Sequence, residues 1–457
     1  MSNWYVTASG GGSHTGADWT NAWTMSGTNS INWASINPGD TIYLGCGTYS
    51  LTTTFVIGAS GTAGNLIQIL AANSTMDGAT VTGKAGWTTA LDTATGHQVV
   101  INAPSGDQDA VYINNGLGSY LTIDGRVAAG LAGGTLYGIV INFGKTVAGG
   151  GGIEIDGSTD FTNQTFRCIQ LIGPGAPIAQ LSDIRALDFT PGGNITNIVL
   201  QYVDAGGYGD AGIYLTCAFP SVVTNTLIEH CNFHDHDVDP SVRANFHPNE
   251  LFLGQGDNWT IRYCKIYDIG VEGLFWGYGP GTNCKVYRNI FYNASVDGNG
   301  RATSFDDAAK NNSWILYNNT FVDTYAWAWD TGLATAATFT SSDIKNNIYI
   351  NTNANNASGT HDYNLSDVNP GEAHSVTAAR GVLFVGVNST PYTPPYDVHL
   401  VSTSPARGVG VNLGAPYNVD MDGNIAPASG PWDMGAYQYA SSPPPPTSSG
   451  FWPIRQV

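Results

Sequence analysis

Carboxylates and aromatic rings recur at matching positions of several strand-like stretches, and this combination of side chains suits sugar chemistry. Glu250, Asp306 and Asp330 are the acidic candidates for catalysis, because paired carboxylates act as acid, base or nucleophile in glycoside hydrolysis. Aromatic rings beside such acids offer an apolar face and hydrogen-bond acceptors to a sugar. The residues expected to contact a substrate are Tyr214, Phe252, Phe275, Ser304 and Lys265.

A long insert at 234–248 carries a second group of acidic residues. Asp235, Asp237 and Asp239 alternate along it, the spacing of an oxygen-ligand calcium loop, and Asp268 is expected one coil below Asp235. The insert lacks the glycine and the terminal glutamate of an EF-hand, so a solvated acidic turn is the alternative. Calcium is therefore the expected cofactor, and no organic cofactor is expected.

Basic residues near these acids leave a second reaction open. β-Elimination requires a base, for which Arg243, His247 and Lys265 are candidates, and a cation that neutralises a uronate. The acids at 306 and 330 belong to a strand pattern with a well-determined register, whereas Arg243 and His247 belong to the insert. Hydrolysis is therefore slightly favoured over elimination.

These residues are positioned by one short phrase that occurs five times between Asn225 and Asn351. Superposing the five copies places five side chains in one column, with gaps of 33, 25, 30 and 28 residues: Cys231, Cys264, Asn289, Asn319 and Asn347. Such a period indicates stacked supersecondary units, and the phrases alternate apolar and polar residues as strands do. The sequence predicts an all-β, single-stranded, right-handed parallel β-helix, in which the asparagines form a hydrogen-bonded ladder. A β-sandwich with coincidental asparagine spacing is the alternative.

A second alignment predicts which side chains face the interior of the coils. Because successive strand residues point to opposite faces, Tyr214, Phe252 and Phe275 should face outward beside Glu250, lining a groove on residues 212–330. The alternative is a long loop that covers these aromatics. The predicted interior set is almost wholly apolar and consists of Ile213, Leu215, Leu251, Leu253, Leu274, Trp276, Thr303, Phe305, Trp327 and Trp329.

The chain divides into four predicted segments. Residues 1–60 form a capping and entry segment with a short amphipathic helix over 16–23, for which Asp18 is the cap. Residues 61–360 form the coils of the β-helix, 361–440 an irregular closing segment, and 441–457 a proline-rich linker with an apolar tail.

Two parts of the chain resemble the pectate-lyase-like, right-handed β-helix proteins. The opening PGDTIYL at 38–44, GTY at 47–49 and GNLIQI at 64–69 resemble the start of that group. His399-Leu, Ser404-Pro-Ala, DMDGN at 420–424 and DMGAY at 433–437 resemble its closing segment. The resemblance covers nearly all of residues 1–440 and implies the fold. The group includes polysaccharide lyases, hydrolases, epimerases, phage tailspikes and proteins without enzyme activity, so the resemblance implies no single reaction.

Charge and composition limit the partners. The net charge is −19 with only 16 Lys and Arg, which excludes nucleic acid as an expected partner and disfavours an unassisted hold on polyanionic sugars. The chain shows no signal peptide and no membrane-spanning run. Either a leader has been removed or the protein leaves its cell by another route, such as release by lysis as part of a virus particle, so an extracellular or virion location is expected. The expected partner is a polysaccharide or surface glycan. The alternative is a non-catalytic structural or adhesive virion component, such as a trimeric tailspike.

Overall fold

The structure is a computed structural model that describes residues 1–106, 109–114, 116–126, 137–144, 151–174, 184–217, 220–235, 249–270, 272–277, 279, 281–294, 301–305, 313–324, 342–352, 360–386 and 397–440. The chain forms two compact units. Unit 1 comprises residues 1–227, 235–248 and 447–457, and unit 2 comprises 228–234 and 249–446. The segment boundaries expected from the sequence stay predictions.

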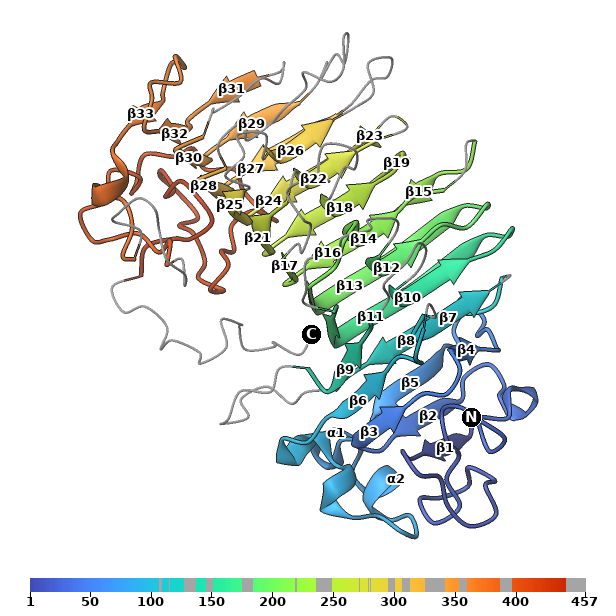
Figure 1. The fold of residues 1–457 in the computed structure, drawn as a ribbon. Helices are drawn as coiled ribbons and strands as arrows, with labels where there is room; N and C mark the ends of the chain where they lie inside the picture. The colour runs from blue at the N-terminus through green and yellow to red at the C-terminus, as the bar shows by residue number, and fades with distance from the viewer. Residues whose placement is uncertain are drawn as a thin grey trace. The chain divides into compact units, whose positions relative to one another are not determined.

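In unit 1 the strands form three parallel stacks, one strand of each stack per coil (Figure 1). The first stack contains β1 (Asn3–Val6), β2 (Thr41–Leu44), β5 (Ile67–Ala71), β8 (Leu121–Asp124), the first halves of β11 (Phe161–Ile172) and β13 (Ile195–Gly206), and β15 (Val223–Thr224). The second contains β3 (Gly47–Ser50), β6 (Val99–Asn102), β9 (Ile139–Asn142) and the second halves of β11 and β13. The third contains β4 (Phe55–Ile57), β7 (Val111–Asn114), β10 (Gly151–Asp156), β12 (Arg185–Phe189) and β14 (Ala211–Leu215).

Unit 2 repeats this arrangement, and β16 (Leu227–Glu229) falls on the boundary between the units. Its first stack contains β20 (Thr260–Arg262), β24 (Cys284–Tyr287), β27 (Trp314–Tyr317), β29 (Asp343–Lys345) and β31 (Thr360–Asp362), preceded by the pair β19 (Gly256–Asp257) and β23 (Gly281–Thr282). The second contains β17 (Asn232–His234), β21 (Lys265–Ile269), β25 (Ile290–Ala294), β28 (Thr320–Val322), β30 (Ile348–Ile350), β32 (Leu365–Ser366) and β33 (Val376–Thr377). The third contains β18 (Asn249–Leu253), β22 (Glu272–Trp276) and β26 (Arg301–Phe305). All these pairings are parallel, so the predicted β-helix fold is confirmed.

The predicted asparagine ladder is present at the bend between the first and second stacks of unit 2. The backbone N–H of Cys264 donates to Asn289 Oδ1 at 2.9 Å, and that of Asn319 donates to Asn347 Oδ1 at 2.9 Å. The residue before each ladder position has a positive φ, for example 58° at Arg288 and 53° at Asn318. A single left-handed residue thus turns the chain, and the side-chain amide that follows it accepts from the backbone of the preceding coil.

The interior of the coils is apolar, as the predicted register requires. Ile213, Leu251, Leu274 and Trp276 are fully buried. Leu251 lies directly across from Leu274 in the register of β18 and β22, so equal side chains stack from coil to coil. The six cysteines are buried free thiols, so the column that contains Cys231 and Cys264 holds no disulfide.

The prediction of a helix over residues 16–23 is wrong, because these residues form bends and turns. Asp18 still caps a turn by accepting from the backbone N–H of Asn21 at 2.8 Å, and Trp19 and Trp23 are buried. The helices of the described residues are short: α1 (Ser74–Asp77), α2 (Ala79–Thr82) and the 3₁₀ turns η1 (Trp33–Ser35), η2 (Thr89–Leu91), η3 (Thr93–Thr95) and η5 (Arg380–Val382). No described helix is long and apolar enough to span a membrane.

The closing segment at 397–440 packs on the bend residues of unit 2. Tyr263 donates to the carbonyl of Val419 at 3.4 Å, and Arg288, fully buried, donates to the carbonyl of Gly435 at 2.9 Å. These contacts fix the irregular segment to the regular coils.

Candidate functional site

Four outward side chains form a continuous row across the third stack of unit 1. The register pairs Tyr112 with Glu154, Glu154 with Asp188, and Asp188 with Tyr214, one residue on each of β7, β10, β12 and β14. Their strand neighbours, such as Ile113, are buried inside the coil, so alternation directs the four side chains away from the interior. Three of them are half-buried, whereas Asp188 is only 5% exposed. We call these four residues the outer row. Neighbouring members are about 4.8 Å apart at the backbone, the ordinary spacing of paired strands.

Arg185 fixes one end of the outer row. Its Nη1 donates to Asp188 Oδ2 at 2.8 Å and its Nε donates to Asp210 Oδ2 at 2.8 Å. The guanidinium carbon lies 3.5 Å from the ring centroid of Tyr214, which is cation–π geometry. Burial opposes the charged form of Arg185, yet Asp188 and Asp210 outweigh it and hold the pKa of the guanidinium above its ordinary value. Arg185 is therefore a fixed cation that orients Asp188.

The other end of the outer row is acidic. Burial raises the pKa of Tyr112, and the charges of Asp156 and Glu154 raise it further. Asp109 accepts from the backbone N–H of Gly151 at 2.7 Å at the start of the same stack. The position before Tyr112 in the register is Val56, whose side chain is 45% exposed. A tyrosine ring and an apolar side chain thus lie beside several carboxylates on a partly solvated sheet face.

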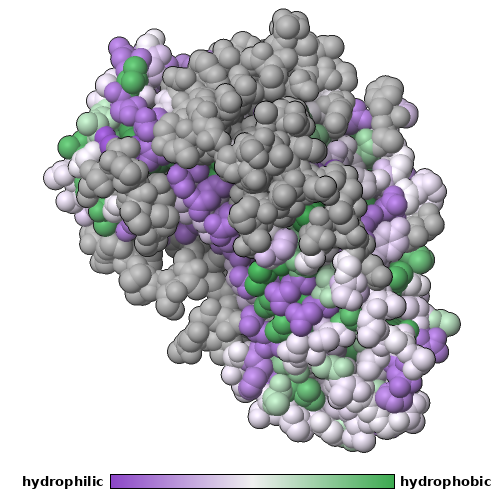
Figure 2. Space-filling view, in the orientation of Figure 1, coloured by the Kyte–Doolittle hydropathy of each residue, from purple (hydrophilic) through white to green (hydrophobic). Residues whose placement is uncertain are grey.

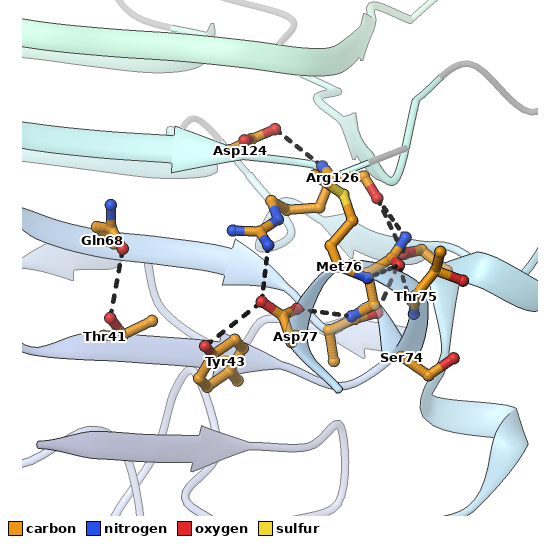
Figure 3. Close-up of polar contacts among 12 residues, drawn as sticks. Thr41, Tyr43, Gln68, Ser74, Thr75, Met76, Asp77, Asp124 and Arg126 are labelled. Atoms are coloured by element: carbon orange, nitrogen blue, oxygen red, sulfur yellow. Dashed lines mark hydrogen bonds and ion pairs between the residues drawn. The ribbon is translucent and has the colours of Figure 1, made fainter. Parts of the chain in front are cut away.

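A second polar cluster in unit 1 surrounds Asp77 at the end of α1 (Figure 3). Figure 3 shows Arg126 and Tyr43 directed at the Asp77 carboxylate; Arg126 Nη2 donates at 2.7 Å and the Tyr43 hydroxyl donates at 3.5 Å. Burial raises the pKa of Asp77, while Arg126 opposes that shift. Asn73 completes the cluster by donating its backbone N–H to Asp77 at 3.1 Å. Because the carboxylate is buried and already bonded to three groups, this cluster holds α1 on the coils.

The visible surface of unit 1 mixes hydrophilic and hydrophobic side chains. In Figure 2 its described residues show small green and purple areas among pale ones, without one broad apolar area. On this side the described residues of unit 1 therefore form no large apolar patch of the kind that marks many protein–protein interfaces.

The aromatic pair predicted in unit 2 is correctly placed along the chain but is not exposed. Phe252 and Phe275 pair in register on β18 and β22, and their ring centroids are 4.9 Å apart at an interplanar angle of 42°. Each ring is only 7% exposed, so the prediction that these rings face water is wrong. One ring packs on the other, and Phe275 also lies against the backbone of Gly277, where an added Cβ would be 2.6 Å from the ring.

Glu250 is also buried, contrary to the expected outward acid. It is 0% exposed, and Oε1 accepts from the backbone N–H of Gly270 at 3.4 Å. Burial raises the pKa of Glu250 well above its ordinary value. The strand register aligns Glu250 with Gly273, and a Cβ at Gly273 would point at the interior side chains Ile266 and Ile269. Face alternation therefore does not hold at the first residues of these strands, where the chain leaves a bend.

Lys265 lies in a different place from the expected groove. It begins β21 in the second stack of unit 2, not the third stack, and it is near Asp397 and Asp422 of the closing segment. Burial lowers its pKa, and the two carboxylates oppose that shift. His399 bridges the same two carboxylates, with Nδ1 2.5 Å from Asp397 Oδ1 and Nε2 3.0 Å from Asp422 Oδ2. The two carboxylates, His399 and Lys265 together hold the closing segment on the coils of unit 2.

The remaining predicted site residues are only partly described. Asp306, Asp330, Arg243, His247, Asp237 and Asp239 lie outside the described residues, as does the side chain of Ser304. Asp235 belongs to unit 1 and Asp268 to unit 2, where Asp268 accepts from Asn293 Nδ2. Within the described part of the chain, no group of three or more His, Cys, Asp and Glu side chains is arranged to hold a metal ion. The calcium site therefore stays a prediction.

The stacked parallel strands define the class: this is a protein of the right-handed parallel β-helix fold. The family described as "Right handed beta helix region" matches residues 146–354. The fold is similar to that of pectate lyase Pel9A, at 16% identity, with 96% of this chain and 97% of that chain covered and a TM-score of 0.49. It is also similar to an alginate lyase from Paenibacillus sp. strain FPU-7, at 16% identity, with 75% and 94% covered and a TM-score of 0.39. A comparison with curated proteins found no match.

The outer row also has a signature in the sequence, which lies mostly outside the strands from which the groove was predicted. The phrases VYIN at 111–114, IEID at 153–156, LDF at 187–189 and IYL at 213–215 share the alternation of inward apolar and outward polar residues. Only the last of these was included in the alignment. The first three are separated by glycine-rich turns of unequal length, which obscures their common period.

Proposed function

We propose that this protein binds a polysaccharide or surface glycan along the outer row of unit 1. The observation that carries the proposal is the row itself, because Tyr112, Glu154, Asp188 and Tyr214 occupy one register position on four consecutive strands. A repeating row along a sheet face suits a ligand that also repeats. The rigid parallel strands hold the side chains at fixed spacing, so little conformational entropy is lost on binding.

The chemistry of the row supports a sugar ligand. Tyr112 and Val56 offer apolar surface to a sugar ring, while the half-buried carboxylate of Glu154 can accept hydrogen bonds from hydroxyl groups. The proposal moves the binding face from residues 212–330 to residues 111–215. The polysaccharide lyases of similar fold support only the fold at their level of identity.

Glycan-array screening followed by calorimetry of Tyr112→Ala tests the proposal. Truncation of the ring should weaken glycan binding by about 1 kcal/mol or more, the scale of a lost binding contact. Tyr120→Ala is the matched control, since Tyr120 is another half-buried tyrosine of unit 1, on the turn before β8 and outside the outer row. Equal losses in the two variants, or no glycan bound by the wild-type protein, would refute the proposal.

Glycoside hydrolysis is the second candidate function, favoured by the register of Glu154 and Asp188. The two acids are register partners on neighbouring strands, with Glu154 half-buried and Asp188 5% exposed, and a retaining glycosidase needs its two carboxyl groups about 5–5.5 Å apart. Arg185 orients Asp188 as a nucleophile would require, which leaves Glu154 for the acid role. A reducing-end assay on the bound glycan should detect cleavage that Glu154→Gln and Asp188→Asn each abolish. If the wild-type protein binds without cleaving, the row only binds.

A further inference from the structure

Two neighbouring positions of the ladder column hold cysteine instead of asparagine. Cys231 and Cys264 are fully buried in unit 2, and the next ladder positions hold Asn289 and Asn319. An asparagine amide donates to the backbone of the preceding coil, as Asn289 Nδ2 does to the carbonyl of Ile261 at 2.9 Å, whereas a thiol is a weak donor. The two cysteines therefore weaken the ladder where they stand, and they place sulfur atoms in adjacent coils.

The two cysteines occupy the same register position of adjacent coils. The pairing of β17 with β21 sets Asn232 opposite Lys265, so Cys231 lies opposite Cys264 one residue earlier. The backbone N–H of Lys265 donates to the carbonyl of Cys231 at 2.9 Å. Paired strands place such Cα atoms about 4.8 Å apart. Disulfides join cysteines whose Cα atoms are roughly 4.4–6.8 Å apart, so the backbone spacing suits a cross-link.

The two sulfur atoms also lie on the same side of their bends. Cys231 Sγ donates to the carbonyl of Glu229 at 3.2 Å, and Cys264 Sγ donates to the equivalent carbonyl of Arg262 at 3.2 Å. Cys264 Sγ is in addition 3.7 Å from the carbonyl of Ile228, which belongs to the coil of Cys231. The Cys264 thiol is therefore directed toward the preceding coil.

Cys284 is a buried cysteine with tryptophans, not thiols, as its register neighbours. It pairs with Trp314 on β27, and the register of β20 and β24 places Trp259 on its other side. Its Sγ donates to the carbonyl of Thr282, two residues earlier, at 3.5 Å. Cys284 thus resembles the ladder cysteines in burial and hydrogen bonding but differs from them in its neighbours.

We infer that Cys231 and Cys264 form a disulfide when the protein is in an oxidising environment, and that this cross-link stabilises the first coils of unit 2. With oxidised glutathione as the oxidant, one cysteine thiolate attacks a glutathione sulfur and displaces one reduced glutathione. The second thiolate then attacks the mixed disulfide and releases the other. Two electrons and two protons pass from the protein to glutathione. The link closes a loop that contains the insert at 234–248, which restricts the unfolded chain.

Incubation of the full chain with oxidised glutathione tests this inference, which is independent of glycan binding by unit 1. Protein purified in dithiothreitol is incubated at temperatures up to the onset of melting, because fully buried thiols react when the coils open. The remaining thiols are then alkylated in guanidinium, and the peptides are mapped by mass spectrometry. Two of the six cysteines should be joined in one Cys231–Cys264 link. The melting temperature should rise by roughly 5–10 °C, and dithiothreitol should reverse the rise.

Two variants form the matched comparison. Cys264→Asn introduces the residue found at the next three ladder positions, so this variant should fold without the thiol. It should lose both the link and the rise in melting temperature that glutathione causes. Cys284→Ser removes a thiol that is equally buried, and it should keep both.

Three results would overturn the inference. The first is that all six thiols stay reduced up to the onset of melting. The second is a link between other cysteines, or glutathione adducts without the Cys231–Cys264 link. The third is a rise in melting temperature that persists in Cys264→Asn, because the cross-link would then not be its cause.

Discussion

Asn289 and Asn319 lie one coil apart and are joined by two hydrogen bonds to one oxygen. Asn319 Oδ1 accepts from the backbone N–H of Asn289 at 3.1 Å and from its Nδ2 at 3.1 Å. Asn319 in turn donates Nδ2 to the carbonyl of Val286 at 2.9 Å, and both asparagines are fully buried. Each ladder amide therefore satisfies backbone groups of the preceding coil, and it is linked to the following coil through the next amide of the ladder.

Asn319→Ala should destabilise unit 2 by about 3 kcal/mol or more, because it leaves buried backbone donors and acceptors without partners. Asn319→Asp should cost at least as much, since the isosteric carboxylate cannot donate to Val286. Urea unfolding followed by circular dichroism measures both. Asn369→Ala, at an exposed asparagine, is the control. A loss below about 0.5 kcal/mol for Asn319→Ala, the range of surface substitutions, would contradict a structural role for the ladder.

Stability should fall at alkaline pH because of His399. Burial opposes its protonation, but Asp397 and Asp422 outweigh burial and raise the pKa of His399 to about 9. The folded-state pKa exceeds the unfolded value of about 6.5, so the stabilisation is fully present below about pH 6.5 and is lost as pH rises through 9. Its size is up to about 3 kcal/mol.

Melting temperatures from pH 6 to pH 10 check this dependence. Subtracting the profile of His399→Gln removes the contribution of other titrating groups, including Lys265. The difference between the two proteins should shrink across that interval. A difference that stays constant with pH would show that His399 does not titrate in the folded protein.

Leu274→Ala and Phe275→Ala should both destabilise the protein, because both side chains are buried in the structure. We expect about 2–5 kcal/mol for the leucine and about 3 kcal/mol or more for the phenylalanine, whose loss leaves a cavity against Phe252. Val56→Ala, at an exposed outward position of β4, should change stability by less than about 0.5 kcal/mol. Denaturant unfolding distinguishes these values, and a silent Phe275→Ala would mean that its ring faces solvent.

Arg185→Ala should cost about 3 kcal/mol of stability, since it leaves Asp188 and Asp210 without their shared partner. Arg185→Lys should recover only part of this loss, because one ammonium group cannot reproduce the two-sided fork or the stack on Tyr214. Lys84→Ala is the control, at an exposed lysine of the same unit. Full wild-type stability of the lysine variant would show that the geometry of the guanidinium at this site is unimportant.

Calcium should raise the melting temperature if Asp235, Asp237, Asp239 and Asp268 bind it, and EDTA should reverse the rise. Asp237→Ala should remove most of the effect. Asp160→Ala, at an exposed aspartate of unit 1, is the control and should leave the calcium response intact. A melting temperature that neither calcium nor chelator changes would exclude the site.

The sequence by itself determined the features that repeat locally. The ladder at Asn289, Asn319 and Asn347 and the inward position of Leu251 and Leu274 follow from two short-range rules, the alternation of faces along a strand and the recurrence of a bend after each coil. Both rules leave a regular pattern along the chain, so both can be predicted from the sequence.

Only the tertiary structure decided which outward or polar side chains are covered and which are solvated. Phe252 and Phe275 follow the predicted alternation yet are buried, and Glu250 leaves the alternation because its strand begins at a bend. Lys265 lies beside Asp397 and Asp422, carboxylates more than a hundred residues away in the chain. Tyr112 and Glu154 become neighbours only because a whole coil separates them in sequence. Burial and pairing of this kind depend on packing between distant segments, and no local pattern encodes it.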